Sequence, residues 1–178
     1  MELCRLTISH VHSEGRAHGH PILRTPARAL DRREVKSPAI QQLIDDMLQT
    51  MAEYHGAGLA APQVYLDLRL LVAICDVENA AAPLVLVNPE SIKMSDETDE
   101  EWEGCLSIPD VRGNVPRARE ITVRALDRMG VEFEARDFPA RVIQHEYDHL
   151  DGVLLLDRMR SLESLAFVGV TSATAPAF

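Results

Sequence analysis

The sequence predicts one domain in which helices and β-strands are mixed. Its 178 residues match the usual size of a single domain and are enough to bury a hydrophobic core. Two helical patterns, over residues 37–56 and 139–152, accompany four strand-like apolar runs. The last two runs flank a short turn, which is typical of a β-hairpin.

The first helical pattern has clear signals at both ends. Ser37 can cap its first turn, Pro38 suits the first helical position, and Gly56 can supply a left-handed stop. Apolar residues recur at helical spacing at Ile40, Leu43, Ile44, Met47, Leu48 and Met51. We therefore assign this methionine-containing stripe to the core rather than to a cofactor site.

The strand-like runs cover residues 70–75, 84–88, 121–126 and 131–135, and DRMG between the last two predicts the hairpin turn. Pro139 then opens the second helix, which Gly152 can close. The acidic stretch SDETDEEWEG is interpreted as a solvated loop without acid-based chemistry.

Charge and hydropathy exclude several classes of function. The formal net charge of −10 offers no basic surface for the phosphates of a nucleic acid or for an anionic membrane, so neutral or peptide-like substrates fit better. No apolar run approaches the roughly 20 residues that span a bilayer. The N-terminal stretch lacks the apolar core of a secretory signal, so we expect a cytoplasmic location.

The stretch QHEYDH carries the strongest chemical signal. His145 and His149 are four residues apart on the second predicted helix, so their side chains project from one face with β-carbons about 6 Å apart. Two imidazoles at this spacing can bind one metal ion, and Glu146 stands beside them as a base for a water molecule. The apolar neighbours indicate a buried helix, where three ionisable side chains would be costly unless engaged.

A catalytic metal site needs a third ligand. No histidine follows His149, and Cys105 in EGCLS is the best remaining soft ligand. A Cys/His/His set leaves a fourth position open, as catalytic rather than structural sites do. Considered alone, Cys105 would more simply be a buried thiol, and with Cys4 and Cys75 it makes an odd count that excludes a disulfide framework.

The segment GAGLAAPQ, residues 56–63, follows the first helix with small residues and ends in the amide of Gln63. This composition is typical of a backbone that must come close to a ligand, with a donor facing that ligand. The alternative is a helix cap followed by a tight turn. Phosphate binding is disfavoured, because the segment has neither a preceding strand nor a following lysine.

In this order, GAGLAAPQ, EGCLS and QHEYDH resemble the three signature motifs of the peptide deformylase family. The similarity also covers HPILRTPA, IPDVRGNVPRA and DGVLLLDRM, so it extends over roughly residues 20–159. It implies an α+β fold in which antiparallel sheets surround a central helix that bears the HExxH motif. We expect one such domain over residues 1–178, with about the first 19 residues and the tail after about residue 160 at its periphery.

The resemblance implies that the formyl group is removed from the N-terminal formylmethionine of newly made polypeptides and released as formate. It implies one divalent metal ion held by Cys105, His145 and His149. Iron(II) is expected, as in most bacterial members, and zinc, nickel or cobalt could substitute for it. The expected partners are N-formylmethionyl nascent peptides, with neither a nucleic acid nor a membrane among them.

The resemblance also assigns roles to other residues. Glu146 would take a proton from the attacking water and later give it to the leaving amine. The side-chain amide of Gln63 and the backbone N–H of Leu106 would hold the developing oxyanion. Substrate contacts are expected at Gly58, where the peptide would add as a strand, and at Ala57, Trp102, Arg112, Phe138 and Val142.

Two positions depart from the usual deformylase pattern. Tyr65 stands where the family has glycine, so the turn there must differ or hold a strained tyrosine, and Ala57 is smaller than the usual valine or isoleucine. The nearly uncharged tail after Arg160 is unlike the basic extensions by which some members dock on the ribosome, so it gives no support for a ribosomal anchor.

Two other classes stay open at this point. A metalloprotease of the HExxH kind would cleave internal peptide bonds and use a histidine or glutamate as third ligand. A non-catalytic metal-binding protein would close its site with a fourth protein ligand.

Overall fold

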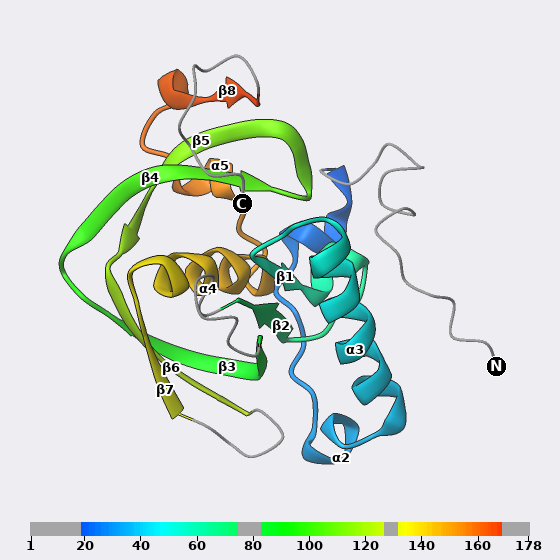
Figure 1. The fold of residues 1–178 in the computed structure, drawn as a ribbon. Helices are drawn as coiled ribbons and strands as arrows, with labels where there is room; N and C mark the ends of the chain where they lie inside the picture. Colours follow the sequence, from blue (N-terminus) through cyan, green and yellow to red (C-terminus); the bar gives the residue numbers. More distant parts are fainter. Residues whose placement is uncertain (1–18, 75–82, 127–131, 169–178) are drawn as a thin grey trace.

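The computed structural model describes residues 19–74, 83–126 and 132–168, without the side chains of residues 91, 92 and 132–138. This part of the chain forms two antiparallel sheets, together with helices and short 3₁₀ turns (Figure 1). None of its helices is long and apolar enough to cross a membrane. The predicted turn at residues 127–130, Cys4 and Cys75 lie outside the described residues.

The larger sheet has five strands in the order β1-β2-β3-β6-β7. They are β1 (Gly58–Ala60), β2 (Leu70–Ala73), β3 (Leu84–Met94), β6 (Glu120–Leu126) and β7 (Glu132–Arg136). The pairing of β6 with β7 confirms the predicted hairpin, and β3 continues well past its predicted end. At the other end of the sheet, β1 pairs only with β2 among the described strands, so one of its edges is free.

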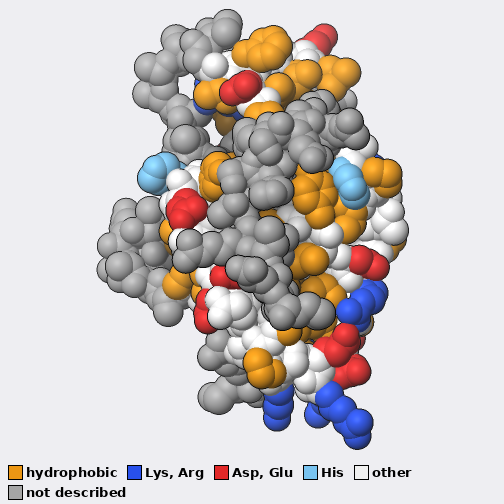
Figure 2. All heavy atoms as spheres, turned by 90° about the vertical axis from the view of Figure 1, so that its right-hand side faces the viewer, with side chains coloured by type: hydrophobic (Ala, Val, Ile, Leu, Met, Phe, Trp, Pro, Cys, Tyr) orange, Lys and Arg blue, Asp and Glu red, His pale blue; other side chains and the backbone are white. Residues whose placement is uncertain are grey.

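The smaller sheet has the strand order β4-β5-β8, with β4 (Thr98–Cys105), β5 (Ile108–Ala118) and β8 (Ala166–Phe167). The long β4–β5 hairpin keeps one register from Thr98 to Gly104 and then shifts before Cys105. The C-terminal segment lies along β5 through η4 (Leu162–Ser164) and β8. It leaves apolar side chains exposed at the top of the molecule (Figure 2), namely Leu162, Leu165, Phe167 and Val168.

Most of the acidic stretch before Cys105, from Thr98 to Gly104, lies in strand β4, so its interpretation as a loop was wrong. Its side chains alternate between faces, and most acidic ones point to solvent, as is common for the charged edge strand of a sheet. Glu103 is the exception, because only 3% of it is exposed. A run of charges therefore concealed one residue that faces inward.

The first predicted helix is α3 (Pro38–Glu53), and the hydroxyl of Ser37 caps it by accepting a hydrogen bond from the N–H of Ile40. Its apolar stripe is buried against β1 and β2, as predicted. The left-handed stop, however, is His55 (φ 54°) rather than Gly56. Histidine tolerates this conformation better than most residues. At Gly56 the surroundings are tight instead, because a β-carbon there would lie 3.3 Å from the carbonyl oxygen of Gly58.

The second predicted helix is α4 (Asp137–Leu150), which begins two residues before the predicted Pro139. It contacts β1, β2, β6 and β7 of the larger sheet and β5 of the smaller one. The amide of Gln144 holds it to β5 by bonding both the N–H (3.0 Å) and the carbonyl (2.9 Å) of Ala118. Gly152, with φ 72°, follows its last turn as predicted, and a β-carbon there would collide with the backbone of Arg24.

Short elements complete the described fold. They are η2 (Pro21–Arg24), α2 (Arg32–Val35), η3 (Ala61–Val64) and α5 (Leu155–Arg158). The 3₁₀ turn η3 matters most for function, because it directly follows β1 and carries Gln63 toward α4. Helix α5 is tied to α4 by an ion pair between Arg158 and Asp148.

Candidate metal centre and active site

Cys105, His145 and His149 come together where the end of β4 meets α4. One ligand atom from each of the three lies within 4.8 Å of the others. The ring centroids of the two histidines on α4 are 5.1 Å apart, and Sγ of Cys105 lies 3.3 Å from Nε2 of His149. The structure therefore brings together the three residues predicted to be metal ligands.

The sulfur of Cys105, just past the β4–β5 register shift, has polar neighbours. The backbone N–H of Ser107 lies 3.4 Å from Sγ, and the side-chain Nε2 of Gln63 lies 3.8 Å from it. Burial raises the pKa of the Cys105 thiol, but the neighbouring His149 and His145 more than offset this and lower it well below its ordinary value. The sulfur is thus disposed to be a thiolate, which is the form that binds metals.

The donor set fits a divalent ion of borderline softness. It combines one thiolate with two imidazoles, the ligands that zinc and late first-row metals share. In His145, Nδ1 is hydrogen-bonded to Glu103 (2.9 Å), which leaves Nε2 to face the other ligands. In His149, Nε2 faces the sulfur, and Nδ1 has no hydrogen-bond partner among the described residues.

Glu146 lies beside the ligand set and is 4% exposed. Burial raises its pKa to about 7, against the lowering effect of His145 and His149. Its Oε2 has no hydrogen-bond partner in the described part of the chain, so this atom is available to a water molecule or a substrate. The side chain rests on Gly58, where an added β-carbon would lie 2.5 Å from Cγ of Glu146.

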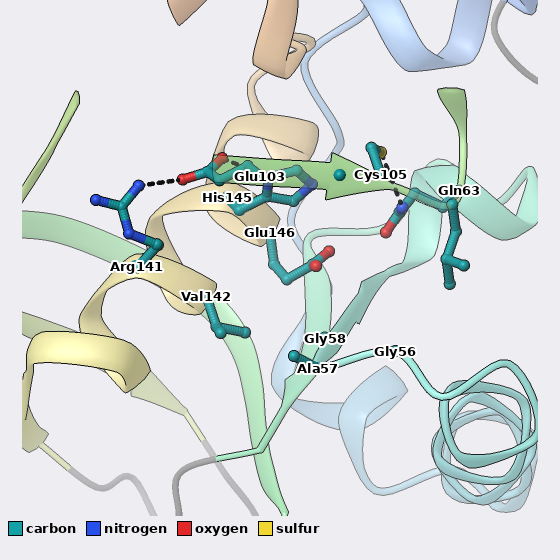
Figure 3. Close-up of a pocket in the computed structure, with 12 residues that line it drawn as sticks. Gly56, Ala57, Gly58, Gln63, Glu103, Cys105, Arg141, Val142, His145 and Glu146 are labelled. Carbon is teal, nitrogen blue, oxygen red and sulfur yellow. Dashed lines mark hydrogen bonds and ion pairs between the residues drawn. The ribbon is translucent and has the colours of Figure 1, made fainter. Parts of the chain in front are cut away.

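Gln63 approaches the site from η3 and is 4% exposed. Its Oε1 accepts a hydrogen bond from the N–H of Ala60 (2.7 Å), which fixes the orientation of the amide. Because the oxygen is occupied, the Nε2 donor is directed toward Cys105 (Figure 3). The predicted amide donor is thus oriented toward the candidate metal site.

Several buried charges around the site escaped the sequence analysis. Glu103 contacts His145 and is itself paired with Arg117 and Arg141, while Asp148 pairs with Arg117. Although burial raises the pKa of Glu103, the hydrogen bonds from Arg117 and His145 lower it below its ordinary value. One available signal was the position of Glu103, two residues before Cys105 on a strand, which places both side chains on the same face.

A small cavity opens beside the site. It is lined by Gly56, Ala57, Gly58, Gln63, Glu103, Gly104, Cys105, Leu106, Arg141, Val142, His145 and Glu146. Of the predicted substrate contacts, Ala57, Gly58 and Val142 thus line the cavity. Trp102 and Arg112 are not among the lining residues, and the guanidinium of Arg112 lies 4.9 Å from the centre of the Trp102 ring. The side chain of Phe138 lies outside the described part.

Known proteins are similar to this chain in both sequence and fold. The family model for polypeptide deformylases matches residues 16–165. The peptide deformylase of Dictyoglomus thermophilum is 45% identical over 147 residues, which are 82% of this chain and 91% of that protein. The chain belongs to the peptide deformylase family. The match reaches a few residues further at each end than the similarity noted in the sequence.

Solved deformylase structures agree with this assignment. A class I type b peptide deformylase from Acinetobacter baumannii, solved with Met-Ala-Ser bound, is 40% identical with a TM-score of 0.75, over 79% of this chain and 94% of that one. The Thermotoga maritima peptide deformylase is 39% identical with a TM-score of 0.73, over 80% and 94% of the two chains. The antiparallel sheets and helices described above are therefore a deformylase fold.

Tyr65, which departs from the usual deformylase pattern, has a left-handed backbone conformation. It has φ 63° and ends η3, two residues after Gln63. Its ring packs edge-on against His20 at 4.7 Å between centroids. Of the two alternatives expected at this position, the structure has the strained tyrosine rather than a different turn, because a bulky side chain occupies a conformation that favours glycine.

Proposed function

We propose that this chain removes the N-formyl group from the formylmethionine that begins new polypeptides and releases formate. Membership of the metal-dependent deformylase family supports this reaction. The observation that carries it is the cluster of Cys105, His145 and His149 beside a cavity that Cys105, His145 and Glu146 line. Water adds to the formyl carbon, the carbon–nitrogen bond breaks, and a free amino terminus is left.

The metal ligands in this proposal are Cys105, His145 and His149, and the ion is iron(II), with nickel, cobalt or zinc able to replace it. When bound, such an ion polarises the formyl oxygen and makes water a stronger acid. The set has three protein ligands, which matches a catalytic rather than a structural site. Metal analysis of protein purified without oxygen tests the identity of the ion.

Glu146 acts as the general base and then as the general acid. A base that works near neutral pH needs a pKa near neutrality, and burial brings the pKa of Glu146 to about 7. Its unpaired Oε2 can take a proton from the attacking water and deliver it to the leaving nitrogen. No other carboxylate among the described residues that line the cavity is free for this role, because both oxygens of Glu103 accept hydrogen bonds from arginines.

Gln63 and Leu106 hold the negative charge that develops on the formyl oxygen. The amide of Gln63 is oriented in advance by Ala60, so no reorganisation is needed when the charge appears. Leu106 follows Cys105 and lines the same cavity, and its backbone N–H is the second donor in the proposal.

The substrate backbone adds as a strand to the free edge of β1 at Gly58, near the end of β4. Main-chain pairing is indifferent to side chains, which suits nascent chains of many sequences. The methionine side chain enters the pocket formed by Ala57 and Val142, and Phe138, Trp102 and Arg112 are proposed to contact the peptide further out. The Met-Ala-Ser complex of the related Acinetobacter baumannii enzyme supports a peptide of this kind.

The remaining assignments follow from family membership. Helix α4 is proposed as the central helix that presents the HExxH motif, and residues 1–178 as a single domain with peripheral ends. The natural substrates are N-formylmethionyl nascent peptides in the cytoplasm, and neither a nucleic acid nor a membrane takes part.

The test compares formyl-Met-Ala-Ser with acetyl-Met-Ala-Ser as substrates of the nickel-loaded protein. Release of formate from the first, with little or no reaction of the second, is expected. Cleavage of an internal peptide bond instead would indicate a metalloprotease, and tight metal binding without hydrolysis of either peptide would indicate a non-catalytic metal-binding protein.

A further inference from the structure

Glu103 accepts four hydrogen bonds in the interior of the protein. Its Oε1 accepts from Nε of Arg117 (2.9 Å) and from a terminal nitrogen of Arg141 (2.8 Å). Its Oε2 accepts from the other side of the Arg117 fork (2.9 Å) and lies 2.9 Å from Nδ1 of His145. The Glu103 side chain is 4% exposed, so these partners replace its hydration.

Three of the four hydrogen bonds to Glu103 come from arginines, whose side-chain nitrogens can only donate. These bonds hold the carboxylate in the place where its Oε2 lies 2.9 Å from Nδ1 of His145. With Nδ1 engaged in this way, Nε2 is the ring nitrogen that faces the other two candidate ligands.

Arg141 makes two further hydrogen bonds to backbone besides its bond to Glu103. It stands one turn before His145 on α4, and its side chain is 6% exposed. One terminal nitrogen also donates to the carbonyl of Val115 on β5 (2.8 Å), and the other donates to the carbonyl of Asp99 on β4 (2.8 Å). The guanidinium is therefore fixed by backbone on both strands of the hairpin (Figure 3 shows it facing Glu103).

We propose that Arg141 is a positioning residue of the metal centre, which acts by holding Glu103 in the place where it accepts from Nδ1 of His145. The proposal deepens the function given above and rests on it. Arg141 is not a catalytic residue in this account. It acts on His145 only through Glu103, so its loss should first weaken metal binding.

Arg141 is a better probe of this arrangement than Arg117. Arg117 also pairs with Asp148 (2.5 Å), so its loss would disturb the contact between β5 and α4 as well. Replacing Arg141 leaves both bonds from Arg117 to Glu103 in place. Arg141 has one further acidic partner, Glu101 (3.3 Å), whose side chain is 60% exposed. Glu101→Gln is therefore a matched control.

The experiment measures the apparent Kd for cobalt(II) by competition with a chelator, for wild type, Arg141→Met, Arg141→Lys and Glu101→Gln. The visible absorption of bound cobalt and the Tm of each metal-free protein are recorded in parallel. Methionine keeps the unbranched stem and removes the donors, so the Kd should rise roughly 10- to 100-fold, the usual effect of losing a partner of a metal-bound histidine. The cobalt spectrum should shift with it.

Each control has a defined result. Glu101→Gln should bind cobalt as wild type does, and Arg141→Lys should show a smaller rise in Kd, because lysine keeps the charge but loses the fork. If Arg141→Met does not fold, the lysine variant decides the question. If a folded Arg141 variant has the wild-type Kd and the wild-type cobalt spectrum, the role of Arg141 is overturned. The proposed deformylase function would still stand in that case. A wild type that binds no cobalt and releases no formate would overturn the proposed function as well.

Discussion

At the scale of single residues, the chemistry depends on Glu146 and on the glycine beneath it. Glu146 is buried next to two histidines. Burial disfavours its charged form and raises its pKa to about 7. Gly58 sets where the carboxylate stands, because its missing side chain leaves the space that Cγ of Glu146 fills. The same glycine belongs to the free edge of β1, so one small residue serves both the base and the peptide backbone.

Replacing Glu146 with glutamine tests the base directly. The variant keeps the size of the side chain and removes its ability to take a proton, so turnover of formyl-Met-Ala-Ser should fall by roughly 10²-fold or more. Metal content should stay at the wild-type level, since Glu146 is not in the ligand set. Near-normal turnover would remove Glu146 from the mechanism.

Replacing Gly58 with alanine tests its spacing to Glu146. The new β-carbon would lie 2.5 Å from Cγ of Glu146, so the base must move. A displacement of this order costs roughly 10²-fold in catalytic rate, because proton transfer depends on geometry. Steady-state kinetics and metal content are measured together, with Gly19→Ala as control, since no atom of the described residues lies within 4 Å of a β-carbon there. Unchanged kinetics in Gly58→Ala would show that the site has more room than the structure indicates.

At the scale of secondary-structure elements, the turn after β1 carries strain close to the site. Tyr65 ends η3 in a left-handed conformation, immediately after the turn that positions Gln63. Its ring packs against His20 and the core cluster around α3, so packing opposes the backbone strain. Two substitutions at this position can separate the two effects.

The matched pair is Tyr65→Ala and Tyr65→Gly. Both lose the ring, and only alanine keeps a β-carbon in the left-handed region, so the glycine variant should be the more stable by about 1 kcal/mol. The same pair of substitutions at Gln42, an exposed position within α3, should give the reverse order. There the alanine variant should be the more stable by about 1 kcal/mol, because glycine is a poor helix residue. Urea unfolding measures both differences. If Tyr65→Ala is more stable than Tyr65→Gly, the backbone at this position is not strained.

The elements also show what the sequence could and could not predict. Helices α3 and α4 and the β6–β7 hairpin were predictable, because apolar periodicity and caps are local signals. Strand β4 was not, because its acidic residues resemble a solvated loop until β5 is seen to pair with them. The ligands Cys105, His145 and His149 stood in recognisable motifs, whereas the bonds from Arg141 and Arg117 to Glu103 depend on packing between distant segments.

At the scale of the whole molecule, the ligand set joins the two sheets. Cys105 belongs to the smaller sheet, and the two histidines belong to α4, which packs on the larger sheet through β1 and β2. A series of ion pairs runs beside it, from Arg158 on α5 through the buried Asp148 on α4 to the buried Arg117 on β5. These pairs tie α5 and the smaller sheet to the helix that carries both histidines.

This arrangement couples metal binding to the stability of the whole chain. An ion that binds only the folded protein, at a free concentration about 100 times its Kd, adds about 2.7 kcal/mol, which corresponds to a rise in Tm of roughly 5–10 °C for a chain of this size. Removing nickel with a chelator should therefore lower the Tm by that amount. Cys105→Ser replaces a soft thiolate with a hard neutral hydroxyl, so most of the metal-dependent shift should disappear. Glu146→Gln should keep the full shift, because it removes no ligand. Calorimetry of the three proteins with and without chelator makes the comparison, and a full shift in Cys105→Ser would remove Cys105 from the ligand set.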